Sequence, residues 1–415
     1  MIRTVLLLVF LTLACSTVTP PAPATPAAPA AAPKVDEQVL GAIKQLEEAL
    51  VQQPTNTPWI YILATYYDRA RDTENVVKWL TRLDELGWEH GVSRFEFRNS
   101  NSTAFRDIVA KLEAREPRVN HARRAFTMAN QRTLIPEGIT HDPVDDVFYV
   151  TSIYHRKVVK VDRQGRTTDF TNEAQHGMLA GLGTHVDAQR RLLWVASATA
   201  PEMVGHAPEH QGRSALFAFD LRNGNVVKKI EEGSAEQPSF LNDFTILPDG
   251  TLLITDTTRN QVFRLAPDAN ALEVWADDFR FPNGIVAAGE HVYVGDFRGI
   301  TRVSLADKSK QRIEPAAGVL LNGIDGLALH GNALIAIQNV LGKARVVRVG
   351  ADSNRVELLE VKNPAFELPT TGVVIGDELW FIANPGLRSF DEGKIWPREK
   401  LADPIMLRLP LAPAR

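Results

Sequence analysis

The stretch Pro136-Glu137-Gly138-Ile139, followed shortly by Val147-Phe148-Tyr149-Val150, begins a pattern that decides the fold. It predicts one short apolar strand and then a second, joined by a turn. The same pattern recurs, so that its copies start at Glu137, Leu182, Asn242, Asn283, Asp325 and Thr370. The intervals are 45, 60, 41, 42 and 45 residues, which is about the length of one four-stranded propeller blade. The pattern therefore predicts six blades.

A third apolar run follows each pair of strands. These runs cover residues 157–162, 215–220, 261–265, 299–303, 345–349 and 404–409. One further strand near residues 124–127 precedes the first copy, and pairing it with the last run would close a ring and hide the sheet edges. We therefore expect a mainly β fold, with a six-bladed β-propeller over residues 124–411. A β-sandwich with fortuitous spacing is the alternative.

The N-terminus indicates export. Residues 1–14 combine an early Arg3 with an apolar run too short to span a bilayer, as in a signal peptide. Leu11-Thr12-Leu13-Ala14-Cys15 resembles a bacterial lipoprotein box, in which Cys15 becomes the lipidated first residue. The resemblance implies a cell-envelope protein that meets the membrane only through this lipid. Ser16 fits the periplasmic side of the outer membrane, and an ordinary secretory signal remains the alternative.

Two segments separate this signal from the propeller. Residues 15–34 are almost entirely Pro, Ala and Thr after the cysteine, which predicts an extended tether. Residues 35–118 carry helical spacing, first at Val39, Ile43, Leu46 and Leu50. Later apolar runs predict a helical pair over residues 59–83 and another helix over 104–112, so this is a small all-α domain. It is similar to a degenerate tetratricopeptide unit, which would offer a groove to a protein partner; a simple helical bundle is the alternative.

Composition excludes several classes of function. The net charge is −4 with interspersed signs, so no basic face for nucleic acid is indicated. Cys15 is the only cysteine, so disulfides play no part in the fold. The sequence has neither Gly-x-Ser-x-Gly nor His-Glu-x-x-His, the signatures of serine and zinc hydrolases.

Four of the six copies begin with a carboxylate or amide side chain, at Glu137, Asn242, Asn283 and Asp325. In a closed ring these side chains would converge near the axis, and we call them the axial site. Calcium prefers six to eight oxygen ligands, and two carboxylates would balance its charge. Zinc would prefer His or Cys. We therefore expect Ca²⁺, with another divalent cation as the alternative, and open positions for water or substrate. For the fifth blade, Asn322 is the alternative to Asp325.

These motifs resemble the SMP-30/gluconolactonase/LRE-like family of calcium propellers, with paraoxonases and diisopropyl-fluorophosphatase as more distant relatives. The residues that carry the resemblance are Pro136-Glu137-Gly138-Ile139, Leu241-Asn242-Asp243, Pro282-Asn283-Gly284-Ile285 and Ile324-Asp325-Gly326-Leu327. The resemblance covers roughly residues 124–411. It implies that the axial site holds calcium, that a small lactone or related ester is hydrolysed, and that Asp325 is the general base or nucleophile.

Two other functions fit the same sequence. A tethered propeller with a helical repeat could be a non-catalytic envelope scaffold, with structural calcium or none, and a periplasmic ligand sensor is a third option. Asp243 and Asp296 are expected to be strand-end hydrogen-bond acceptors. The sequence assigns no role to His155, His176, His185 and His206, and it does not identify the substrate.

Overall fold

The computed structural model describes residues 36–94, 96–315, 320–350, 355–391 and 393–411. The predicted signal peptide, Cys15 and the tether over residues 15–34 lie outside these residues. The chain divides into two compact units. One runs through Pro117 and includes Leu341–Lys343, and the other comprises Arg118–Val340 and Ala344–Arg415.

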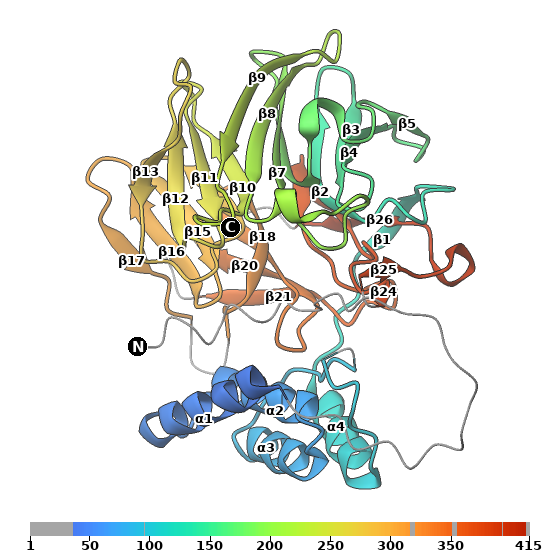
Figure 1. Ribbon diagram of the computed structural model, residues 1–415, viewed down its shortest axis with the longest axis vertical. Coiled ribbons are helices and arrows are strands. Elements are labelled where there is room, and N and C mark those ends of the chain that lie inside the picture. Colours follow the sequence, from blue (N-terminus) through green and yellow to red (C-terminus); the bar gives the residue numbers. More distant parts are fainter. Residues whose placement is uncertain (1–35, 95, 316–319, 351–354, 392, 412–415) are drawn as a thin grey trace, which may run out of the picture. The chain divides into compact units, whose positions relative to one another are not determined.

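The first unit contains four α-helices, each of which contacts the next (Figure 1). They are α1 (Glu37–Gln52), α2 (Thr57–Arg69), α3 (Thr73–Glu85) and α4 (Thr103–Arg115). Each helix begins after a residue whose side chain accepts a hydrogen bond from a backbone N–H of its first turn, and these are Asp36, Asn56, Asp72 and Ser102. Such caps satisfy donors that the helix itself cannot pair.

The helical periods that the sequence predicts are confirmed by burial. Ile43, Leu46 and Leu50 of α1 are buried, and so are Val76 and Leu80 of α3. None of the described helices combines the length and hydropathy needed to cross a membrane.

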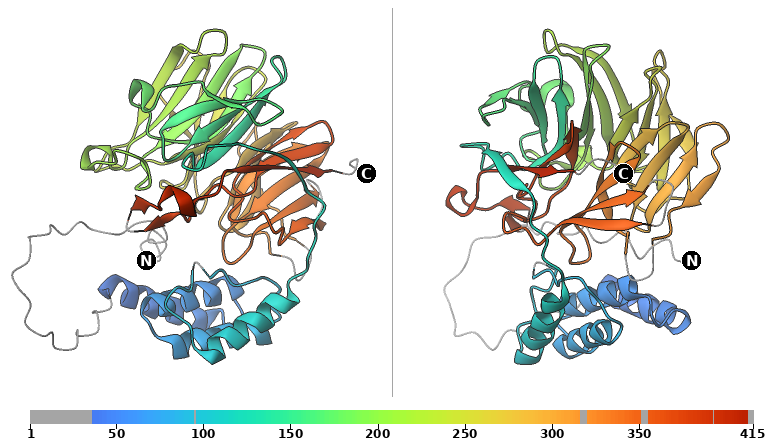
Figure 2. Two further views of the ribbon diagram at one scale, coloured as in Figure 1. Left: turned by 90° about the vertical axis from the view of Figure 1, so that its right-hand side faces the viewer. Right: turned by 180° about the vertical axis from the view of Figure 1, so that it is seen from behind.

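The second unit is a six-bladed propeller of four-stranded antiparallel sheets that stand around a ring (Figures 1 and 2). Blades one to three comprise β2 (Pro136–Asp142), β3 (Val147–Ser152), β4 (Lys157–Val161) and β5 (Thr167–Asp169); β6 (Ala180–Asp187), β7 (Leu192–Ala198), β8 (Ser214–Asp220) and β9 (Val226–Glu232); and β10 (Leu241–Ile246), β11 (Leu252–Asp256), β12 (Gln261–Leu265) and β13 (Glu273–Ala276).

The other three blades continue in the same order. They comprise β14 (Ile285–Ala288), β15 (His291–Asp296), β16 (Gly299–Ser304) and β17 (Lys310–Arg312); β18 (Ile324–His330), β19 (Ala333–Gln338), β20 (Arg345–Gly350) and β21 (Val356–Val361); and β22 (Gly372–Ile375), β23 (Glu378–Ile382), β26 (Ile405–Pro410) and β1 (Arg123–Thr127). Between β23 and β26 lie the small hairpin of β24 (Phe390–Asp391) and β25 (Lys394–Ile395) and a short 3-10 helix, Arg398–Lys400. Two more 3-10 helices, Gln175–Gly177 and Pro208–His210, lie in the first half of the ring.

The sixth blade closes the ring with strands from both ends of the unit. β1 pairs with β26, with Arg123 opposite Arg408 and Thr127 opposite Ile405. The sequence-based prediction of the closure is therefore confirmed. Pairing of this kind removes two open sheet edges, which would otherwise be free to pair with other chains.

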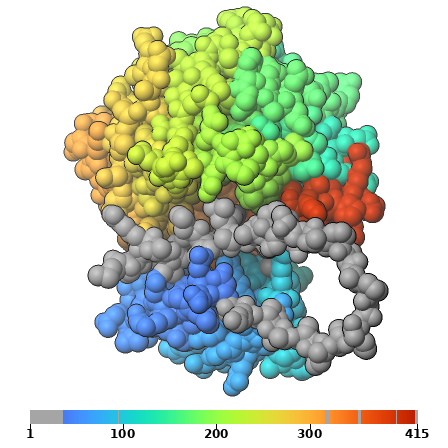
Figure 3. Space-filling model, in the orientation of Figure 1, coloured from blue at the N-terminus to red at the C-terminus, as the bar shows by residue number. Residues whose placement is uncertain are grey.

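Apolar side chains gather between neighbouring blades. One cluster joins the first and sixth blades and includes Phe126, Phe148, Trp380 and Met406. Another joins the third and fourth blades through residues such as Trp275 and Val294. On the face seen in Figure 3, side chains fill the space between adjacent blades. Packing the sheets face to face buries both faces of strands such as β3 and β11, which explains their nearly continuous apolar runs in the sequence.

Four motif glycines are required because neighbouring inner strands pass very close together. A Cβ added at Gly138, Gly183, Gly284 or Gly326 would lie 2.3, 2.6, 2.4 or 2.6 Å from a backbone oxygen of the next blade. The Asn-Gly and Asp-Gly pairs therefore do more than form turns. They let the inner strands approach each other at the axis.

We expect Gly326→Ala to destabilise the propeller by about 1–3 kcal/mol, because the new methyl group would overlap backbone that cannot easily move. Its Cβ would meet the oxygen of Thr370 at 2.6 Å and Cα of Thr371 at 2.9 Å. Denaturant unfolding would measure the loss. Gly41→Ala is the matched control, since it has no atom within 4 Å and should stabilise α1 by about 0.5–1 kcal/mol. Equal unfolding midpoints for Gly326→Ala and the native protein would contradict the steric argument.

Candidate metal centre

The residues of the axial site begin the inner strands of their blades. Glu137, Asn242 and Asp325 are each the second residue of their strand, and Asn283 comes two residues before β14. In β2, β10 and β18 the ladder register shifts directly around these residues, for example between Pro136 and Ile139. A β-bulge of this type takes a residue out of the ladder and re-aims its side chain.

Hydrogen bonds connect neighbouring blades close to the axis at all six blade interfaces. Five of the interfaces are bridged to backbone oxygens: Gly284 N to Asp325 O (2.7 Å), Gly326 N to Thr370 O (3.0 Å), Thr371 Oγ1 to Glu137 O (2.7 Å), Thr151 Oγ1 to Leu182 O (2.7 Å) and Thr255 Oγ1 to Asn283 O (2.7 Å). At the remaining interface, His185 Nε2 lies 3.1 Å from Asp243 Oδ1. These bonds hold the starts of the inner strands together as one layer around the axis.

Asp325 is the centre of a side-chain network in this layer. The amide nitrogen of Asn283 donates to Asp325 Oδ1 at 2.6 Å, and the amide nitrogen of Asn339 donates to Oδ2. Asn339 Nδ2 also reaches the backbone oxygen of Pro369 at 3.1 Å. The structure therefore joins the predicted residues Asn283 and Asp325 directly. The fifth blade presents Asp325 at the position equivalent to Glu137, whereas the backbone oxygen of Asn322 accepts from Gln338.

Two oxygen atoms of the axial site are buried without a hydrogen-bond partner among the described residues. They are Glu137 Oε2 and Asn283 Oδ1. Leaving such acceptors buried and unsatisfied costs about 1–3 kcal/mol each, and more for a charged group. Because a hard cation takes carboxylate and amide oxygens as ligands, the residues present fit a calcium ion.

The electrostatics also indicate a place for positive charge. Burial raises the pKa of Glu137 well above its usual value, and the nearby carboxylates of Asp325 and Asp243 raise it further. Burial likewise raises the pKa of Asp325 to about 7; hydrogen bonds from Asn339 and Asn283 oppose the rise, and Asp243 adds to it. Three carboxyl groups thus interact across the axis with no cationic side chain among the causes. A bound divalent cation would remove most of the penalty for ionising them.

Asn242 and Asp243 occupy the bulge of β10 together. Asn242 Nδ2 donates to Thr257 Oγ1 at 3.0 Å, and its side-chain oxygen has no donor among the described residues. Asp243 accepts from its neighbour Phe244 N at 2.9 Å. Asp243 takes the position that Gly138, Gly183 and Gly326 hold in other blades, and it adds a third carboxylate to the electrostatics of the site.

The four histidines differ in their surroundings. His185 contacts Asp243 and packs its ring against Phe244, with centroids 4.8 Å apart. His155 lies between Thr133 Oγ1, at 2.9 Å, and Glu173 Oε2, at 3.1 Å. His176 and His206 are exposed. Only His185 is linked to the axial residues, through Asp243.

Asp296 behaves as the sequence predicts. Its carboxylate accepts backbone N–H groups of Arg280, Arg298 and Gly299 at 3.0, 2.7 and 3.0 Å. It therefore stabilises a strand end.

Within the described ranges, no group of three or more His, Cys, Asp or Glu side chains that could hold a metal ion is found. The axial site has only two residues of these types, Glu137 and Asp325, so a cation there would depend on amide oxygens and water as well. Sequence reasoning missed Asn339 and the pair Thr370 and Thr371 as parts of the site. Asn339 directly follows β19 at the same end of the blade as Asp325, and that position is the signal that could have found it.

Comparisons with known proteins give distant structural likeness only. No family model matches the sequence, and no curated protein matches it. The structure is similar to a gluconolactonase from Xanthomonas campestris (18% identity, 71% of this chain and 91% of that chain, TM-score 0.48). It is also similar to a PQQ-bound aldose sugar dehydrogenase from Streptomyces coelicolor (14% identity, 70% of this chain and 97% of that chain, TM-score 0.47). A third similar structure is that of virginiamycin B lyase from Staphylococcus aureus (14% identity, 63% of this chain and 80% of that chain, TM-score 0.45). These three proteins have different activities, so no function is transferred from the likeness.

Proposed function

We propose that the axial site binds Ca²⁺ and that the protein hydrolyses a small lactone or related ester there. The observation that carries this proposal is the pair of buried, unsatisfied oxygens, Glu137 Oε2 and Asn283 Oδ1, beside carboxyl groups whose pKa values burial and mutual repulsion raise. A site that is polar, acidic and lacking its own cation is suited to a hard metal ion.

The ligands would be the side chains of Glu137, Asn242, Asn283 and Asp325. When bound, calcium would polarise the carbonyl group of the substrate. Asp325 is the candidate general base, because it is a buried carboxyl group at the proposed ion and, once the ion keeps it ionised, it can take a proton from a water molecule. Asn283 and Asn339 hold its two oxygens, so they fix the direction in which it can accept that proton.

We expect Asp325→Asn to lower kcat by about 10²–10⁴-fold, the usual contribution of a general base. A panel of lactones and aryl esters, assayed with calcium and with a chelator, would provide the substrate. Asp277→Asn is the matched control, since Asp277 is 81% exposed and should leave turnover unchanged. If the Asp325→Asn variant hydrolysed every substrate as fast as the native protein does, Asp325 would not be the base.

The alternative is a non-catalytic binding propeller, and one observation favours it. Both oxygens of Asp325 already accept amide hydrogen bonds, as they would in a purely structural network. Asn283→Ala separates the two functions. The enzyme should keep its fold and lose calcium-dependent turnover, whereas a binding module would show no turnover in either form of the protein.

A further inference from the structure

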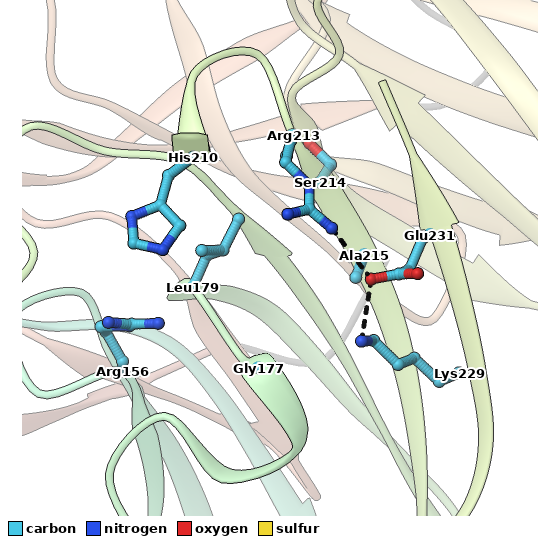
Figure 4. Close-up of a pocket in the computed structure, with 9 residues that line it drawn as sticks. All are labelled: Arg156, Gly177, Leu179, His210, Arg213, Ser214, Ala215, Lys229 and Glu231. Carbon is cyan, nitrogen blue, oxygen red and sulfur yellow. Dashed lines mark hydrogen bonds and ion pairs between the residues drawn. The ribbon is translucent and has the colours of Figure 1, made fainter. Parts of the chain in front are cut away.

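A cavity of about 160 Å³ lies between the first and second blades (Figure 4). It is far larger than the roughly 10–15 Å³ that a single water molecule needs, so it has room for a small anion. Its lining residues are Arg156, Gly177, Leu179, His210, Arg213, Ser214, Ala215, Lys229 and Glu231. None of them belongs to the axial site.

The topology places the cavity at the same end of the propeller as the axial site. Arg156 directly precedes β4, Leu179 precedes β6, and Ser214 begins β8, while Glu231 lies at the end of β9. In an antiparallel blade, the first and third strands start at the edge where the second and fourth end. Glu137 stands at this edge too, as the second residue of the inner strand β2.

Arg156 is a half-buried cation without a carboxylate within 4 Å among the described residues. Its Nε donates to Met178 O at 2.9 Å, and its Nη1 donates to Val204 O at 3.3 Å. These two bonds fix the guanidinium plane, while Nη2 finds no acceptor in the described part of the chain. Burial lowers the pKa of Arg156, and the charge of Glu173 partly opposes this. A fixed guanidinium with an unused edge is well suited to bind a carboxylate or phosphate.

His210 supplies a second donor on the same side of the cavity, where Figure 4 shows its ring facing Arg156. Its Nδ1 accepts the backbone N–H of Ala207 at 3.2 Å, so the neutral ring carries its proton on Nε2. Burial and the charge of Arg156 lower the pKa of His210. The ring therefore stays neutral at pH 7, and Nε2–H remains available as a hydrogen-bond donor.

The opposite side of the cavity carries two cations that share one anion. Arg213 Nη2 and Lys229 Nζ lie 3.2 and 2.9 Å from the same oxygen of Glu231, Oε1. With Arg156, the lining has three positive charges and one negative charge. Two further carboxylates lie outside the lining: Glu173 faces His155, and Glu209 is exposed. The interior of the cavity is thus left with more cationic than anionic groups.

We propose that this cavity binds the carboxylate or phosphate group of a small molecule. The anion lies between the free edge of Arg156 and the Arg213–Lys229 pair, and it accepts a hydrogen bond from His210 Nε2. The site is independent of metal binding at the axis.

Calorimetric titration of the full-length protein with inorganic phosphate, and separately with acetate, tests the proposal. A chelator in the buffer keeps metal ions out of the axial site during the measurement. Constant ionic strength keeps the screening of charges the same in every titration. We expect saturable binding of at least one probe. Arg156→Gln should weaken it by about ten- to a hundredfold, the contribution of a charge-assisted hydrogen bond. Tighter binding of phosphate than of acetate would identify a phosphorylated ligand, and the reverse order an organic acid.

Glu231→Gln provides a test with the opposite sign. Removing this carboxylate releases Arg213 and Lys229 and should strengthen anion binding several-fold, which loss of structure could not do. Arg264→Gln is the matched control, because Arg264 also pairs with a glutamate, Glu273, on the outer strands of the third blade; it should leave the affinity unchanged. Absence of saturable binding for both probes, or equal affinities in the native, Arg156→Gln and Glu231→Gln proteins, would overturn the proposal.

Discussion

Calcium added to the metal-free protein should raise the free energy of unfolding by about 2.7 kcal/mol when its concentration is a hundred times the dissociation constant. The gain comes from the folded state alone, because the axial residues come together only when the ring is closed. Glu137 Oε2 and Asn283 Oδ1 are buried and unsatisfied without the ion. An ion that coordinates both oxygens therefore removes the cost of burying them unpaired. Thermal or denaturant unfolding at a series of calcium concentrations would measure the effect.

Glu137→Gln gives this experiment its sharpest control. The substitution keeps the size of the side chain and removes a charge that lies near Asp243 and Asp325. Without calcium the variant should be as stable as the native protein or slightly more stable, and it should lose most of the response to calcium. A purely structural Glu137 would behave in the opposite way, with a loss of stability that calcium does not influence. No calcium response in the chelated native protein would refute the metal centre.

The second large effect is on pH dependence. The pKa of Asp325 is raised from 3.8 to about 7 in the folded, metal-free protein. Between these values the folded state holds a proton that the unfolded state has released. The stability of the metal-free protein should therefore fall, by a few kcal/mol, as the pH rises from about 4 to about 7.

Calcium binding should show the reverse trend, since the cation competes with that proton. If calcium displaces one proton, its affinity should decrease by about tenfold for each pH unit below 7, and each further displaced proton should add the same factor. Titrations at pH 5.5, 6.5 and 7.5 would give the slope. Asp325→Asn removes the titrating group, so its metal-free stability should change much less with pH. A calcium affinity that is constant over this range would show that the axial carboxyl groups are ionised before the metal binds.

The blades could be predicted from the sequence because each copy carries the same local pattern. Pairs such as Glu137-Gly138 and Asp325-Gly326 mark the start of an inner strand, and the apolar runs after them have strand length. The closure by residues near 124 was also predictable, since a strand precedes the first copy and closing the ring hides sheet edges. The copies at Leu182 and Thr370 lack an acidic or amide starting residue, so only their spacing indicates them.

The details of the site depend on contacts that no local pattern records. Asn339 reaches Asp325 from just after the neighbouring strand β19, and the hydroxyl group of Thr371 reaches the backbone of Glu137 across the closure of the ring. The electrostatic effect of Asp243 on the axial site could not be predicted for a similar reason. In sequence it is the residue after a candidate ligand, but in the folded ring its charge acts on carboxylates from two other blades.

The pairing of β1 with β26 also has a consequence for biosynthesis. Arg123 emerges from the ribosome long before its partner Arg408, so the sixth blade cannot form until β26 has been synthesised. Until then the first and fifth blades expose apolar faces that the finished ring covers, and such intermediates are prone to aggregation. Loss of β26 alone would leave β1 and β23 without the strand that joins them. Closure of the ring therefore depends on β26, the strand of the propeller that is synthesised last.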